Sequence, residues 1–102
     1  MNEQKIQALL GFAQKAGKIV SGDEMVIAGI KKRQVFFVIL AQNASENTCK
    51  DVLYYINKYQ IPYLIWSDKE DLGCMIGKSP RAALGVTEKN FALGIQKSIY
   101  GV

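Results

Sequence analysis

Apolar residues recur along this chain at two different spacings, which predict where its helices and strands lie. A first helix is indicated by the i, i+3, i+4, i+7 spacing of Ile6, Leu9, Leu10 and Ala13. Gly17 stands where such a helix would end. By contrast, residues 35–41 read VFFVILA, seven unbroken apolar residues that are mostly β-branched or aromatic. This run predicts a strand buried on both faces.

The remaining pattern predicts three more strands and four more helices. The strands are expected at 18–20, 61–66 and 82–86. The helices are expected at 22–33, then from Asn43 and Ser45 onward, then through Ile76 with Gly77 closing it, and last around Phe91, Ile95 and Ile99. Two of these helices begin with an S-x-x-E sequence, at Ser21 to Glu24 and at Ser67 to Glu70, and each predicts a capping box.

Helices that alternate with strands, of which two are continuously apolar, predict an α/β fold. We expect one domain over residues 1–102, a three-layer α/β/α sandwich around a four-stranded mixed sheet. The loops around 21–24, 42–45 and 78–81 should then lie on the surface. The aromatic residues of the third helix and third strand are expected to belong to the core or to cover it.

Composition narrows the range of functions. The chain has 13 Lys and Arg against 9 Asp and Glu, for a net charge of +4, a moderate excess that suits an anionic partner such as RNA. It has no histidine, so general acid–base catalysis at neutral pH would fall to carboxylates or lysines with strongly shifted pKa values. No metal-ligand cluster or nucleophile–base pair is recognisable, and we expect no cofactor, no metal and no enzymatic activity.

The two cysteines and the N-terminus indicate the compartment. Cys49 and Cys74 lie in apolar helical patterns without CxxC spacing, and we interpret them as reduced core residues. The sequence MNEQKIQALLGF lacks the layout of a signal peptide, and no apolar run approaches a membrane span. We therefore expect a cytoplasmic monomer with no membrane contact.

The stretch KAGKIVSGDE, residues 15–24, concentrates candidate chemistry. Gly11 to Ile19 fails as a phosphate loop, because five residues separate its glycines and Ile19 replaces the Ser or Thr that binds magnesium. A capping box explains Ser21 and Glu24 but not Gly22. The alternative is a ligand site, in which a glycine at the helix start admits RNA and carboxylates accept from base N–H groups.

Two further basic stretches each have two interpretations. Lys31, Lys32 and Arg33 are explained either as cations at a helix C-terminus or as phosphate contacts. Residues 77–81, GKSPR, form either a polar turn or the second side of an RNA groove.

The order of these elements resembles the ribosomal protein L7Ae/L30e family of small α/β/α RNA-binding proteins, and most closely its bacterial members. The resemblance spans about residues 6–95. It rests on Gly17-Lys18, on Gly22 at the start of the second helix, on residues 35–41 followed by Gln42-Asn43, on Ile61-Pro62-Tyr63, and on Leu72-Gly73 with Gly77.

The resemblance implies kink-turn recognition, in which the loop into the second helix meets guanine edges of sheared G·A pairs. The family's glycine falls on Gly22, but its next polar pair falls on Glu24 and Met25, and its lysine falls on Ala28. Lys18 and Lys32 are positions that are often basic in relatives, and Lys78 to Arg81 match the second RNA-facing loop. The candidate RNA-binding residues are Lys18, Gly22, Asp23, Glu24, Met25, Lys32, Asn43, Lys78, Ser79, Pro80 and Arg81.

Two hypotheses follow from the sequence. The first is a non-catalytic, ribosome-associated protein that binds structured RNA such as a kink-turn. The second is a protein-interaction or scaffold module that keeps the fold and contacts a protein partner through Asp23, Glu24 and Met25.

Overall fold

Five helices and four strands alternate through residues 1–101, the part of the chain that the structure, a computed structural model, describes. The longest helix has 14 residues, and none of the described helices is both long and apolar enough to cross a bilayer. In chain order the elements are α1 (Glu3–Lys15), β1 (Ile19–Ser21), α2 (Asp23–Lys31), β2 (Phe37–Leu40), α3 (Glu46–Tyr59), β3 (Tyr63–Ile65), α4 (Lys69–Met75), β4 (Ala83–Val86) and α5 (Lys89–Tyr100).

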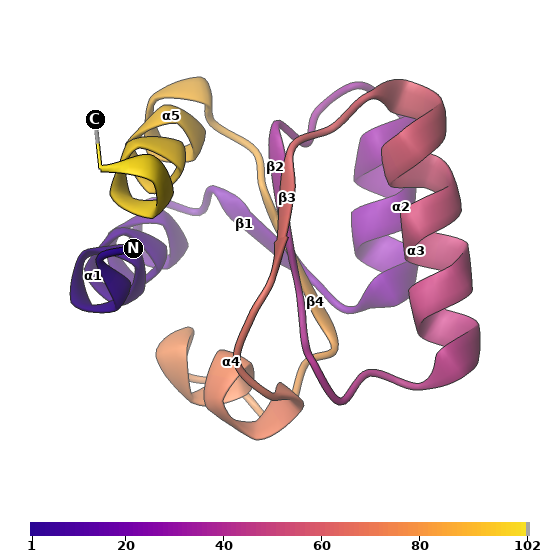
Figure 1. Ribbon diagram of the computed structural model, residues 1–102, viewed down its shortest axis with the longest axis horizontal. Helices are drawn as coiled ribbons and strands as arrows, with labels where there is room; N and C mark the ends of the chain where they lie inside the picture. Colours follow the sequence, from indigo (N-terminus) through magenta and orange to yellow (C-terminus); the bar gives the residue numbers. More distant parts are fainter. Residues whose placement is uncertain (102) are drawn as a thin grey trace.

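The four strands form one mixed sheet in the order β1-β4-β2-β3. β2 and β3 are parallel, and β4 runs antiparallel to both β1 and β2. Helices α2 and α3 cover one face, and α1 and α5 cover the other, with α4 beside α1 at one end (Figure 1). The predicted α/β/α sandwich is therefore confirmed.

β2 is the centre of the core. All four of its residues are buried, because its side chains alternate between two apolar layers. Phe37 and Ile39 pack with the buried residues of α1, α4 and α5, whereas Val38 and Leu40 pack with those of α2 and α3. The unbroken apolar run in the sequence thus marks a strand that is covered on both sides, as β4 also is.

The strand directions give the sheet two unlike ends. β1, β2 and β3 all end, and β4 begins, at one end, which we call the carboxyl edge; the opposite end is the amino edge (Figure 1). Helices α2 and α3 begin at the carboxyl edge and end at the amino edge. Loops and helix starts that lie far apart in the sequence therefore meet at the carboxyl edge.

Two local predictions differ from the structure. The N-cap of α4 is Asp68, whose carboxylate accepts from the Asp71 N–H, rather than Ser67, which has a left-handed φ of 64°. The capping box is wrong by one residue because the chain leaves β3 through that left-handed turn. Cys49 is half-buried, but Cys74 is exposed and not a core residue, because it faces away from the sheet on a short helix.

Gly73 lets the loop after α4 fold back onto its own helix. The Lys78 N–H donates to the Gly73 carbonyl at 2.8 Å. A Cβ on Gly73 would lie 2.2 Å from the Ser79 carbonyl oxygen and 2.9 Å from that of Lys78. These atoms are backbone and cannot rotate away, so only glycine permits this path of the 78–81 loop.

Gly73→Ala is expected to lower the free energy of unfolding by about 1–3 kcal/mol, because the added methyl group must displace that backbone. Urea unfolding measures the loss, and NMR shifts of residues 78–81 report the displaced loop. Gly11→Ala is the matched control, since no atom lies within 4 Å of its new methyl group, and helix propensity makes it neutral or stabilising. Equal effects of the two substitutions would contradict the close approach at Gly73.

Candidate nucleic-acid interface

The start of α2 is built on a glycine in a backbone conformation that other residues avoid. Gly22 is the N-cap of α2, with φ 89° and ψ 150°, and its N–H donates to the Ala83 carbonyl on β4. A Cβ built on Gly22 would have no atom within 4 Å, so the space above it is open. The helix therefore presents bare backbone to the solvent at the carboxyl edge.

The capping box predicted from Ser21 to Glu24 is not formed. Ser21 is the last residue of β1, paired with Leu84, so the helix cap falls one residue later, on Gly22. The Ser21 hydroxyl instead accepts from Nε of Arg81 at 3.1 Å. Glu24 is thus released from the capping role that the sequence pattern indicated.

Asp23 and Glu24 are adjacent carboxylates that differ in their hydrogen bonds. Asp23 Oδ1 accepts from the Glu24 N–H at 2.9 Å, and its Oδ2 accepts from the Thr48 hydroxyl on α3 at 3.4 Å. Thr48 in turn is held by Ser45, the N-cap of α3. Asp23 therefore ties the first turn of α2 to the first turn of α3.

Glu24 and Met25 point outward from the same helical turn. Both are exposed, and 57% of Met25 is accessible to solvent. An ionised carboxylate accepts only, so Glu24 suits N–H donors, while Met25 offers an apolar contact. Ala28, half-buried one turn further along, carries no charge.

Arg81 fixes the loop of residues 78–81, which lies across from the start of α2. Its Nη1 donates to the carbonyls of Ser79 and Pro80 at 3.1 Å and to the Ser79 hydroxyl at 2.6 Å, while Nε reaches Ser21. The half-buried guanidinium therefore fixes its own loop against the end of β1. Nη2 is the remaining donor group of this arginine and can face a ligand.

The start of α2 and the 78–81 loop form the two walls of a cleft of about 400 Å³ at the carboxyl edge. Six of the predicted RNA-binding residues line it: Gly22, Asp23, Glu24, Met25, Pro80 and Arg81. Ser21, Thr48 and Ala82 line it too and were not in the predicted set. Thr48 follows Ser45 by three residues at a helix start, but its place in the cleft depends on the parallel packing of α2 and α3.

The other five predicted residues do not line the cleft. Lys78 and Ser79 are exposed on the adjoining loop, and the Asn43 amide is engaged by the Lys69 N–H and the Glu70 carboxylate at the start of α4. Lys18 precedes β1 and Lys32 follows α2, so they lie about 13 Å and about 15 Å from Gly22, at the amino edge.

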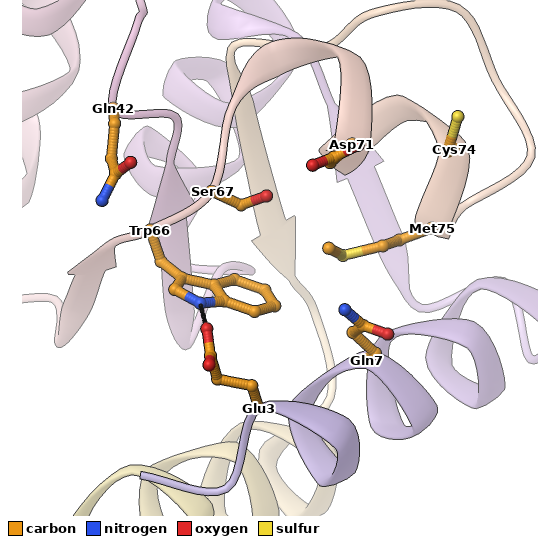
Figure 2. A pocket seen from close by; sticks show the side chains of 8 residues that line it. All are labelled: Glu3, Gln7, Gln42, Trp66, Ser67, Asp71, Cys74 and Met75. Carbon is orange, nitrogen blue, oxygen red and sulfur yellow. Dashed lines mark hydrogen bonds between the residues drawn. The ribbon is translucent and has the colours of Figure 1, made fainter.

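A second hollow of about 590 Å³ lies between α1 and α4, also toward the carboxyl edge (Figure 2). The Trp66 indole N–H donates to the Glu3 carboxylate at 2.7 Å, and Ser67 and Asp71 lie across from that contact. Its eight lining residues are Glu3, Gln7, Gln42, Trp66, Ser67, Asp71, Cys74 and Met75. With two carboxylates and no cation among them, this hollow disfavours phosphate.

Comparison with known proteins places this architecture in a family. Residues 4–93 match the profile described as the ribosomal protein L7Ae/L30e/S12e/Gadd45 family. The chain belongs to this family. Its match covers every element described above except the first residue of α1 and the end of α5.

Similar proteins span nearly the same length. The chain is 36% identical over 100 residues to an Enterococcus faecium protein named RNA-binding protein YlxQ, covering 98% of this chain and 96% of that one. It is 40% identical over 84 residues to the Bacillus subtilis (strain 168) protein of the same name, covering 82% and 84%. A solved structure from Bacillus halodurans, described as a protein with unknown function, has a TM-score of 0.89 at 33% identity and covers 94% of this chain and 97% of that one.

The division of labour between the two carboxylates of this family member can be tested by stability. Asp23→Ala is expected to lower the free energy of unfolding by about 0.5–2 kcal/mol, because it removes the acceptor of the Glu24 N–H and of Thr48. Glu24→Ala is expected to change it by less than about 0.5 kcal/mol. Urea unfolding of both variants measures the difference, and a larger loss for Glu24→Ala would contradict the assignment.

Proposed function

We propose that this chain is a non-catalytic, cytoplasmic RNA-binding protein that acts as a monomer and recognises a structured internal loop of the kink-turn type. The Glu24 carboxylate carries this proposal: it is exposed beside a glycine helix start and is not used by a capping box. Two relatives of similar length are named RNA-binding proteins, which supports RNA as the partner.

The chemistry of the cleft suits base edges better than phosphates. Asp23 and Glu24 outnumber Arg81 among its charged lining residues, so the cleft floor repels a plain phosphate backbone. Sheared G·A pairs turn guanine N–H groups outward, and a carboxylate accepts from such donors without desolvating a donor of its own. Glu24 would thus read the base edge, while Met25 packs against a sugar or base face.

The second wall of the cleft, the 78–81 loop, would hold the RNA backbone on the far side of the bend in the kink-turn. Arg81 keeps Nη2 available, and Lys78 is exposed on the same loop. Charge-assisted bonds from Arg or Lys to phosphate fix register without reading sequence. The family's lysine is absent at Ala28, and Lys32 lies beyond the end of α2, at the amino edge, so the loop cations would supply the positive charge.

The proposal predicts different affinities for three RNAs: a kink-turn RNA, the same RNA with its G·A pairs disrupted, and a plain duplex. A kink-turn RNA should bind more tightly than the same RNA with its G·A pairs disrupted, and the difference should persist across a salt series while overall affinity falls. Glu24→Gln should reduce this discrimination about ten-fold, because the amide loses a charge-assisted acceptor and adds a donor.

Gel shifts with the three RNAs measure these values. Asp51→Asn is the matched control, because it removes the same charge from an exposed carboxylate in the middle of α3. Equal affinity for the kink-turn, the disrupted RNA and a plain duplex would refute kink-turn recognition.

We also propose that the RNA is ribosomal. Affinity capture of the chain should recover ribosomal RNA with ribosomal proteins, and ribonuclease treatment should release both. A single protein retained after ribonuclease, and bound equally by Lys18→Ala and Arg81→Ala, would instead support an interaction module that uses the exposed Glu24 and Met25.

A further inference from the structure

Charge is unevenly divided between the two ends of the molecule. Seven of the 13 Lys and Arg residues lie at the amino edge: Lys15, Lys18 and Lys89 near α1 and α5, and Lys31, Lys32, Arg33 and Lys58 near α2 and α3. Glu88 is the one acid among the nine that lies with them, so the amino edge carries +6 and the rest of the chain −2.

These amino-edge cations are not neutralised by carboxylates. Within residues 1–101, the one ion pair is Lys50–Glu46, on the other half of α3. Four of the seven cations lie over aromatic rings instead: Lys31 over Tyr55 at 4.8 Å, Arg33 over Tyr59 at 5.5 Å, Lys58 over Tyr54 at 5.8 Å and Lys89 over Phe36 at 5.4 Å. A ring holds a cation in place without cancelling its charge, so N–H donors remain for an anion.

Helix dipoles do not account for the whole group. Lys15, Lys31 and Lys58 lie in the last turns of helices, where a cation is favoured. Lys89 is the first residue of α5, where a cation opposes the dipole, and Arg33 lies beyond α2 with a left-handed φ of 58°. Lys18 lies in the turn before β1. These three residues need another explanation.

Glu88 offsets little of the positive charge at the amino edge. Its carboxylate accepts from the Phe91 N–H at 2.9 Å as the N-cap of α5. The Phe91 and Asn90 N–H groups, followed by the charge of Lys18, hold its pKa below the usual value. Its charge is thus directed into the helix start.

From this surface we propose that the amino edge is a second RNA site, which binds the phosphate backbone of a duplex. The molecule measures 24–29 Å across, and the Debye length at physiological ionic strength is about 8 Å, so the acids of the carboxyl edge do not screen the amino edge. A polyanion with regularly repeated charges matches cations on both sides of the sheet. An acidic peptide would need apolar anchors, whereas each of the four rings here already has a cation over it, including Tyr54, which is 58% exposed.

The inference goes beyond the proposed function, because it requires no kink-turn. With the cleft at one end of the sheet and the basic surface at the other, one protein would hold two RNA segments at opposite ends of the molecule. The cleft would select the internal loop, and the amino edge would add affinity that is independent of sequence.

The test uses a perfectly paired RNA duplex and fluorescence anisotropy over a salt series. The variant Lys31→Gln/Lys32→Gln/Arg33→Gln should lose at least ten-fold in affinity at low salt. Its slope of log K against log salt should fall by about 2–3, since each phosphate contact contributes about 0.7–0.9. The control Lys5→Gln/Lys50→Gln/Lys97→Gln removes the same charge from exposed positions elsewhere and should change the slope by less than about 1.

A second variant, Lys18→Gln/Lys89→Gln, tests the other side of the sheet should the triple variant fail to fold by circular dichroism; its slope should fall by about 1–2. Equal slopes for the amino-edge and control variants, or no binding of the duplex by the unmodified chain, would overturn the proposal. G·A discrimination by the kink-turn RNA should survive in the amino-edge variants. Its absence in the unmodified chain would refute the cleft proposal alone.

Discussion

The burial of β2 on both faces is the constraint on which the rest of the structure depends. A strand whose successive side chains Phe37, Val38, Ile39 and Leu40 are all buried must be covered by helices on both sides. Covering it on both sides requires crossover connections, which set β1, β2 and β3 in one direction and bring three strand ends to one edge. Ligand sites of α/β sheets commonly form outside such strand ends, and the cleft between α2 and the 78–81 loop lies there.

Sequence patterns within single segments predicted the fold. They did not predict features that depend on contacts between residues far apart in the sequence. The order of elements, the buried strand and the left-handed Gly17 and Gly77 follow from local periodicity and turn chemistry. Both helices begin one residue later than their predicted capping boxes: α4 because Ser67 takes a left-handed turn, and α2 because the point where β1 ends is set by its partner strand. Ser21 pairs with Leu84, more than 60 residues away in the sequence, and so cannot act as the cap.

The candidate site shows the same division. The sequence predicted the residues of each wall, since Gly22 to Met25 and Pro80 to Arg81 are contiguous. It did not predict that Arg81 binds Ser21 or that Thr48 joins Asp23, because both contacts cross between elements. Lys18 lies only four residues before Gly22 in the sequence, but an extended strand of three residues carries it to the opposite edge.

Helix polarity links the fold to its charge distribution. Because α2 and α3 both begin at the carboxyl edge, the acids favoured in their first turns, Asp23, Glu24 and Glu46, gather there, and the lysines favoured in their last turns gather at the other end. Asp23 is held by Thr48, so within the cleft Glu24 is the acid left for a partner. A cleft that is acidic and a far edge that is basic cannot hold the same part of an RNA. In the functions that we propose, the first would accept from bases that have left their Watson–Crick pairs, and the second would neutralise phosphates of a helix, so the net charge of +4 describes neither surface.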